Sequence, residues 1–428
     1  MKMTKSTPTI INIFIDGTWQ KDDQEIPTNI SKLYQAARDC NTEGVEQHNV
    51  YIDGLGTRGT SLQNLFRGAF GTDIEDLVKE AYKEVVTAYE PGDSINLLGY
   101  SRGATVTRML AGMIDNVGIL NVGKLRHSNV DKIIDKGWRL YRKIGEYEDQ
   151  DTHPSHKVAS QFRRLFCHAD ENGTHDSSPN IDHMVLFDTV GALGVPDKFF
   201  ISNLFNRHFY PSLNSNYYRF YNNTVPELVN NVIHFIAMDE ARDTYELTPI
   251  ENNPANRTKI QNIYVRGDHG VVGGGSEDHQ GLSDHVGIMA ITHISDIIEF
   301  CPVKIEELFN PDPFGSPYTT DEFYNWQSSS DGPLQKMLHS LASIFHDKVL
   351  RDPPSGLRDG DPTPQTIYAR VDEHSLEAVY THNGIAPESF DIDPALKREL
   401  WKTFMSPKLR EKQTPFQGFN PAELQRNC

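Results

Sequence analysis

The pattern Gly-Tyr-Ser-Arg-Gly at residues 99–103 is the part of the sequence best suited to covalent chemistry. It matches Gly-X-Ser-X-Gly, in which the serine occupies a strained turn between a strand and a helix and the flanking glycines leave room for that turn. A short apolar run at 95–98 precedes Ser101, and apolar residues at helical spacing follow it over 104–114. This context predicts that Ser101 is a nucleophile. The simpler alternative is a serine that caps the following helix.

A serine nucleophile needs a base, and the base needs an acid that orients it. Enzymes with this motif carry them in the chain order Ser, Asp or Glu, His. Asp188 ends the apolar run 183–187, and His269 follows the apolar run 262–265. Both are expected at carboxyl ends of strands, where parallel sheets gather their ligands. The order therefore predicts the triad Ser101, Asp188 and His269. Three other histidines lie in apolar patterns that we interpret as helical, with packing as their expected role: His234, His285 and His293.

An oxyanion that forms during acyl transfer needs two backbone N–H donors. The amide of Arg102, which begins the helix after the serine, is expected to supply one, and the Gly17-Thr18 turn after the first apolar run the other. Asp16-Gly17-Thr18 also suggests a haloacid-dehalogenase-type phosphatase. Such an enzyme needs a nucleophilic aspartate two residues before Asp16, where this chain has Phe14. We therefore reject that interpretation and expect Asp16 to accept backbone hydrogen bonds in its loop.

The elements that must position these residues alternate between strand and helix. Short, β-branched apolar runs predict five strands, at 10–15, 49–52, 94–98, 183–187 and 262–265. Helical spacing predicts helices at 30–37, 73–89 and 104–114. No hairpin signal separates the strands, so we predict an open, mostly parallel sheet with helices on both faces.

The 428 residues are predicted to form one large catalytic domain over residues 8–300 and an extension of helices and loops over 301–428 that packs against it. A polar stretch over 116–180 is too long for a bare connection and is predicted to be an inserted helical cap. A second insertion, rich in aromatic residues, is predicted at 196–230.

Aromatic side chains are unusually dense at 198–221. Phe199, Phe200 and Phe205 are candidates for a lid or an acyl-chain contact. The alternative is that these aromatics pack the cap onto the sheet. Four further polar residues lie close together in the sequence, and we interpret their segment as a helix: His234, Asp239, Glu240 and Arg242. Their charges are expected to connect this helix to the loop that carries His269. A metal site is the alternative.

The balance of 41 Lys and Arg against 59 Asp and Glu gives a net charge of −18. This charge disfavours nucleic acid as a partner and predicts repulsion from strongly anionic bilayers. The four cysteines show no zinc-ligand spacing, and triad chemistry needs no metal or cofactor, so none is expected. No apolar window approaches the ~20 residues of a membrane span, and the N-terminus lacks the pattern of a cleavable signal peptide. We therefore expect synthesis in the cytoplasm and no transmembrane segment.

Several motifs together resemble the uncharacterised α/β-hydrolase domain family, whose best-known members are type VI secretion lipase effectors. They extend over about two thirds of the chain and are IDGTW, GYSRGA, FDTVGALG, HFIAMDEAR, GDHGVVGGG and GLSD. The resemblance implies an α/β-hydrolase-like fold, with nucleophile, acid and base at Ser101, Asp188 and His269. The sequence departs from the family at Phe187, where tryptophan is common, and at Asp268, where a hydrophobic residue is usual.

The resemblance further implies ester hydrolysis of phospholipids at a membrane surface and antibacterial or host-directed delivery by a type VI secretion system. A secretion-machinery adaptor or a cognate immunity protein would then be a partner, although no separate spike-adaptor or membrane-anchoring domain is evident. Two alternatives stay open: a hydrolase of soluble esters or peptides, and a catalytically silent interaction module on the same fold. An intact candidate for each triad role argues against the silent module.

Overall fold

The structure is a computed structural model. It describes residues 8–18, 20–54, 74–125, 129–144, 154–169, 179–191, 225–237, 240, 247–248, 250, 257–265, 267–276 and 279–311.

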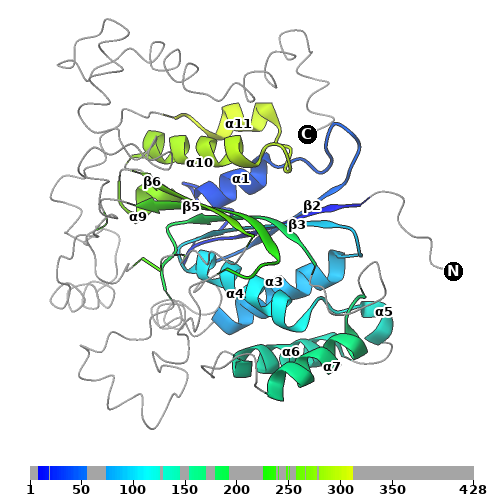
Figure 1. The fold of residues 1–428 in the computed structure, drawn as a ribbon. Helices are drawn as coiled ribbons and strands as arrows, with labels where there is room; N and C mark the ends of the chain where they lie inside the picture. Colours follow the sequence, from blue (N-terminus) through cyan, green and yellow to red (C-terminus); the bar gives the residue numbers. More distant parts are fainter. Residues whose placement is uncertain are drawn as a thin grey trace, which may run out of the picture.

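Within these residues, six strands form one parallel sheet in the order β2-β1-β3-β4-β5-β6 (Figure 1). The strands are β1 (Ile10–Ile15), β2 (Gln47–Ile52), β3 (Ser94–Tyr100), β4 (Ile181–Phe187), β5 (Val229–Ala237) and β6 (Lys259–Val265). Because every pairing is parallel, all carboxyl ends lie at one edge of the sheet. The order reverses between β1 and β3, and a ligand site is expected just outside the carboxyl ends of those two strands.

Helices cover both faces of the sheet (Figure 1). On one face lie α3 (Ile74–Ala88) and α4 (Arg102–Val117), with α6 (Val130–Ile144) and α7 (Pro154–Phe166) in a further layer outside them. The other face carries α1 (Asn29–Ala36), α10 (Gln280–Ile294) and α11 (Pro302–Leu308). The short helix α5 (Val122–Leu125) lies beside α7 in the outer layer. The short helix α9 (His269–Gly273) contacts β5 at the edge of the sheet. This is the α/β-hydrolase-like architecture that the sequence predicted.

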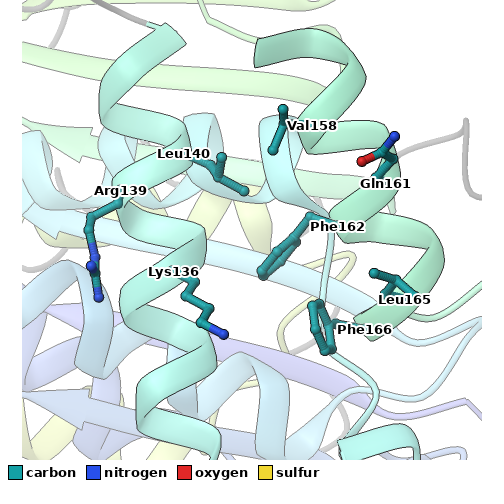
Figure 2. A pocket seen from close by; sticks show the side chains of 8 residues that line it. All are labelled: Lys136, Arg139, Leu140, Val158, Gln161, Phe162, Leu165 and Phe166. Carbon is teal, nitrogen blue, oxygen red and sulfur yellow. The ribbon is translucent and has the colours of Figure 1, made fainter. Parts of the chain in front are cut away.

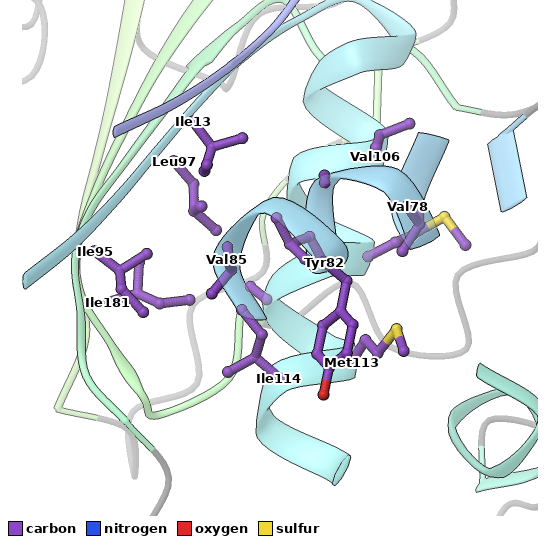
Figure 3. Close-up of a cluster of buried hydrophobic side chains, with 14 of the residues drawn as sticks. Ile13, Val78, Tyr82, Val85, Ile95, Leu97, Val106, Met113, Ile114 and Ile181 are labelled. Atoms are coloured by element: carbon purple, nitrogen blue, oxygen red, sulfur yellow. The ribbon is translucent and has the colours of Figure 1, made fainter. Parts of the chain in front are cut away.

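The core has two parts because side chains of a strand alternate between the faces of the sheet. Ile13 and Ile15 of β1 cluster with Tyr82 on the side of α3 and α4, as Figure 3 shows for Ile13 and Tyr82. Phe14, between them, joins Leu33 of α1 in the cluster on the opposite side. Since both faces of β1 are buried, its residues are apolar on both sides of the strand, with Asn12 as the exception, and do not alternate with polar ones.

Three asparagines pair across the sheet at matching register. Asn12 of β1 lies opposite Asn49 of β2 and Asn96 of β3. Its Nδ2 donates to Asn49 Oδ1 over 2.8 Å, and its Oδ1 accepts from Asn96 Nδ2 over 2.9 Å. A buried amide without a partner is costly, so these pairs favour this register over a shifted one.

The five predicted strands and the three predicted helices are present, with bounds shifted by a few residues. The helical interpretation of the segment around His234 is wrong, because β5 occupies it. A short, fully buried apolar run fits a strand and a helix equally well, so the pattern could not decide. His234 is fully buried in β5, between β4 and β6, and its Nε2 accepts the amide of Thr189 over 3.2 Å. His285 and His293 do lie on a helix, α10.

The predicted domain boundaries stay predictions. Helices α5, α6 and α7 occupy the described part of 116–180, and α11 lies in the described part of 301–428. Of the predicted second insertion, only 225–230 belongs to the described residues. Among the helices that the structure describes, none has the length and apolarity that crossing a membrane would require.

Candidate active site

Ser101 lies in a sharp turn between β3 and α4. Its φ of 57° is in the left-handed region, where a residue with a Cβ is strained, and its side chain makes no capping hydrogen bond to the helix. A Cβ on Gly99 would lie 2.3 Å from Thr107 Oγ1, and one on Gly103 would lie 2.4 Å from the Asp16 carbonyl oxygen. Both glycines are therefore required by the close packing of the turn. The alternative of a helix-capping serine is not supported, because the hydroxyl is directed elsewhere.

The hydroxyl of Ser101 is directed at His269. Ser101 Oγ and His269 Nε2 are 2.8 Å apart, and His269 Nδ1 lies 2.7 Å from Asp188 Oδ2. The second carboxylate oxygen of Asp188 accepts the amide of Ala237 over 2.9 Å. All three side chains are buried, so these contacts form in an environment where charge interactions are strong. The structure thus brings the three residues predicted as a triad into one continuous hydrogen-bonded chain.

The strand ends explain why these residues meet. Ser101 follows β3 and Asp188 follows β4, which is its neighbour in the sheet. His269 begins α9 just after β6, and α9 contacts β5, the neighbour of β4 in the sheet. The Asp268 side chain caps this helix by accepting the amide of Val271 over 3.0 Å. The departure from the family pattern at Asp268 therefore has a structural role.

Two further residues hold the histidine in place. The Tyr100 ring lies 4.8 Å from the His269 ring, centroid to centroid, and its hydroxyl donates to the His269 carbonyl oxygen over 3.1 Å. A Cβ on Gly273 would come within 2.0 Å of that tyrosine ring, so glycine is needed there. Glu240 Oε2 accepts the amide of His269 over 3.2 Å. The sequence pointed to Glu240 as a contact of this loop, but it contained no signal for Tyr100 beyond its place in the motif.

The loop after β1 lies directly against the serine turn. A Cβ on Gly17 would be 3.4 Å from the Cβ of Ser101 and 2.7 Å from the Tyr100 ring. Asp16 accepts hydrogen bonds from the Gly17 amide over 2.6 Å, from the Thr28 hydroxyl over 2.5 Å and from the Tyr51 hydroxyl over 2.6 Å. The amide of Gly17 is thereby directed at Asp16. Of the two predicted oxyanion donors in this loop, Thr18 is the better candidate, alongside Arg102 at the start of α4.

Asp16 provides a pH-dependent test of this loop. Burial raises its pKa from the ordinary 3.8 to about 6, although the hydrogen bonds from Thr28, Tyr51 and Gly17 act to lower it. Between those values the folded protein binds this proton more tightly than the unfolded chain does. The contribution of Asp16 to the free energy of unfolding therefore falls as the pH rises from about 4 to about 6, by roughly 3 kcal/mol in all.

Asp16→Asn keeps an acceptor for the Gly17 amide and does not titrate. The wild type loses the contribution of Asp16 as the pH rises, and the variant has none to lose. The free energy of unfolding of the variant minus that of the wild type should therefore increase by up to about 3 kcal/mol from pH 4 to pH 7. Urea denaturation of both proteins at several pH values measures this difference. Parallel pH profiles would contradict the raised pKa.

The remaining candidate residues have different outcomes. Phe199, Phe200 and Phe205 lie outside the described residues, as do Asp239 and Arg242. Among the described residues, no group of three or more His, Cys, Asp or Glu side chains is arranged to hold a metal ion. Glu240 and His234 contact the amides of His269 and Thr189, so hydrogen bonding to the backbone is their observed role.

A family model matches most of the chain. The model described as the catalytic domain of the Tle1-like phospholipase effectors of the type VI secretion system matches residues 9–297. This range contains Ser101, Asp188 and His269, together with the complete six-stranded sheet.

Individual proteins are similar to this chain as well. The uncharacterized protein YEL023C of Saccharomyces cerevisiae is 28% identical over 251 residues, which are 55% of this chain and 32% of the yeast protein. The Tle1 effector bound to the VgrG spike of the type VI secretion system is 18% identical, with a TM-score of 0.35 over 63% of this chain and 52% of that one. The propionate-bound esterase Est2 of Thermogutta terrifontis is 12% identical, with a TM-score of 0.31 over 69% of this chain and 85% of that one. The chain thus spans about a third of the yeast protein and about half of the Tle1 chain.

Proposed function

Because the chain belongs to the family of type VI secretion phospholipase effectors with a Tle1-like catalytic domain, we propose that it is a serine hydrolase that cleaves carboxylic ester bonds of phospholipids. The observation that most supports the serine mechanism is the hydrogen-bonded chain from Ser101 through His269 to Asp188. A serine in a strained turn, a buried imidazole and a buried carboxylate are together the groups that acyl transfer requires.

The proposed reaction begins when Ser101 Oγ attacks the ester carbonyl carbon and its proton passes to His269 Nε2. Asp188 accepts a hydrogen bond from Nδ1–H, which holds the ring in the required tautomer and stabilises its positive charge. The negative charge that develops on the carbonyl oxygen is stabilised by the amides of Arg102 and Thr18. His269 then gives its proton to the departing alcohol, the lysophospholipid. A water molecule cleaves the acyl-enzyme by the same route and releases the fatty acid.

The proposal also covers how the protein is exported and which proteins bind it. Family membership supports export through a type VI secretion system, with a component of the secretion spike as the partner that carries the protein. An antibacterial role, with an immunity protein protecting the producing cell, is the further part of this proposal. A lid that includes Phe199, Phe200 and Phe205 is likewise proposed, on the density of aromatic residues in that segment alone.

Product analysis tests the substrate. Wild type and Ser101→Ala are incubated with vesicles of mixed phospholipids, and the lipids are then separated and identified by mass spectrometry. We expect free fatty acid and lysophospholipid to accumulate with the wild type and not with the variant. Hydrolysis of a short soluble ester without any lipid product would contradict the phospholipid substrate and favour the soluble-ester alternative. Lipid products that are equal in both samples would contradict the role of Ser101.

A further inference from the structure

A groove of about 340 Å³ runs between α6 and α7 on the outer layer of the fold (Figure 2). Its apolar lining comes mainly from α7, with Phe162 and Phe166 directed into it, and Lys136 and Arg139 of α6 border its other side. We refer to the outward surface of these two helices as the α6–α7 face. In the layered fold, α3 and α4 separate this face from the sheet (Figure 1).

The α6–α7 face is basic in a protein of net charge −18. The two helices carry eight Lys or Arg residues and only two Asp residues. Both aspartates turn toward α3: Asp131 pairs with Lys83 over 2.8 Å, and Asp135 pairs with Lys79 over 3.1 Å. Both acids of α6 thus pair with lysines of a neighbouring helix, although Lys79 is shared with Glu75 of α3. The basic side chains of α6 that line the groove, Lys136 and Arg139, lie apart from these pairs.

Three basic side chains contribute positive charge to the α6–α7 face. Lys136, Arg139 and Arg164 are exposed, and within the part of the chain that the structure describes none of them forms an ion pair. Arg139 Nε donates to the carbonyl oxygen of Asp135 over 3.2 Å. No described acid thus pairs with these three cations, of which Lys136 and Arg139 line the groove and Arg164 directly precedes Leu165 on α7.

Large apolar side chains project from the same face. Leu165 is 65% exposed and Val158 is 45% exposed, and they lie two turns apart on the outward side of α7. Together with Val122 they are the large hydrophobic residues that stand out as exposed among those described. Apolar side chains bordered by Lys and Arg on an amphipathic helix are the pattern of a surface that lies on an anionic bilayer.

We propose that the α6–α7 face docks the protein on anionic phospholipid bilayers. This proposal rests on the proposed function, in which the phospholipids of a bilayer are the substrate. Leu165 and Val158 enter the boundary between headgroups and acyl chains, while Lys136, Arg139 and Arg164 contact the lipid phosphates. The net charge of −18 does not prevent this contact. Salt screens charges over about 8 Å at physiological ionic strength. Each layer of helix or sheet adds about 10 Å between the α6–α7 face and the acidic residues beyond it, so their repulsion of the bilayer is largely screened. The attraction between the basic residues of the α6–α7 face and the lipid phosphates then outweighs this repulsion.

The test uses the inactive Ser101→Ala protein, so that binding is measured without hydrolysis. Sedimentation with vesicles of phosphatidylcholine and phosphatidylglycerol, and with phosphatidylcholine alone, is carried out at 0.1 M salt. A basic residue near an anionic surface changes binding about fivefold, so Lys136→Gln, Arg139→Gln and Arg164→Gln together should weaken binding to the anionic vesicles roughly 100-fold. Leu165→Gln should weaken it several-fold, and this loss should not depend on salt.

The matched control removes the same charge elsewhere: Arg257→Gln, Lys259→Gln and Lys304→Gln, all exposed and none on α6 or α7. It should change binding less than threefold. In the active background, the α6–α7 triple variant should hydrolyse a short soluble ester like the wild type, which verifies its fold.

Three results would overturn the inference: no binding of the parent protein to anionic vesicles, unchanged binding by the α6–α7 triple variant, or an equal loss in the control. Failure of the parent protein to bind would point to an acidic protein segment as the occupant. Binding that follows our expectation without any lipid product from the active enzyme would instead contradict the proposed function and leave the docking surface in place.

Discussion

Ser101→Ala is expected to lower kcat by about 10⁶-fold, which is the scale of losses when a triad nucleophile is removed. The alanine variant lacks the oxygen that attacks the ester carbon. Its residual rate comes from attack by water, helped by the oxyanion donors and by substrate binding. His269→Ala should cost nearly as much, because Ser101 Oγ depends on His269 Nε2 at 2.8 Å to remove its proton. The measurement is the hydrolysis rate of a short soluble ester at saturating substrate.

The double variant Ser101→Ala, His269→Ala should be no slower than either single variant, since the two groups act as one unit. Unfolding midpoints serve as the control for folding, and Ser101→Ala should unfold near the wild type because its hydroxyl does not cap α4. Losses that multiply in the double variant would mean that the two residues act independently. That outcome would contradict the triad.

Asp188→Asn is expected to lower kcat by about 10⁴-fold while the protein stays folded. The amide nitrogen of asparagine would face Nδ1 of His269, which favours the tautomer that carries the proton on Nε2. An Nε2–H cannot accept the Ser101 proton, so the base is lost although the ring remains. Asparagine Oδ1 can still accept the Ala237 amide, which Asp188 Oδ1 accepts over 2.9 Å, and this retains the local fold.

Glu240→Gln is the matched control for Asp188→Asn. It removes a second buried carboxylate that contacts His269, yet its amide oxygen can still accept the His269 amide that Glu240 accepts over 3.2 Å. Its kcat should stay within about tenfold of the wild type, because this contact positions the backbone and does not touch the ring. If Glu240→Gln lost activity as Asp188→Asn is expected to, or if Asp188→Asn stayed within a few-fold of the wild type, the acid would be assigned wrongly.

The triad residues could be predicted because each follows a strand that has a strong local pattern. Ser101 is flanked by glycines that the turn requires. Asp188 ends one apolar run and His269 follows another within a few residues, in a chain without hairpin signals. Parallel topology then places all three at one edge, so knowing the strands was enough to expect them together. The role of Asp16 as an acceptor in its loop was predicted on the same grounds, and its bond from the Gly17 amide confirms it.

Contacts between distant segments could not be predicted in this way. Tyr51 and Thr28 donate to Asp16, and the Tyr100 ring packs against His269, which is 169 residues further along the chain. The strand around His234 was interpreted as a helix, because a buried run of this length lacks a distinguishing period. The basic α6–α7 face could not be predicted from the net charge, which does not show how charges are distributed over the surface. The pairing of Asp131 and Asp135 with lysines of α3 becomes visible with the fold.

The central claim, that Ser101 is an activated nucleophile, is tested most directly by covalent labelling with a fluorophosphonate. The phosphorus forms a bond to the serine oxygen, fluoride leaves, and His269 takes the proton, so labelling requires the triad in its working state. Peptide mapping by mass spectrometry should find the adduct on Ser101 in the wild type, none in Ser101→Ala, and far slower labelling in His269→Ala. An adduct on another residue, or a protein that hydrolyses esters while Ser101 stays unlabelled, would contradict the claim.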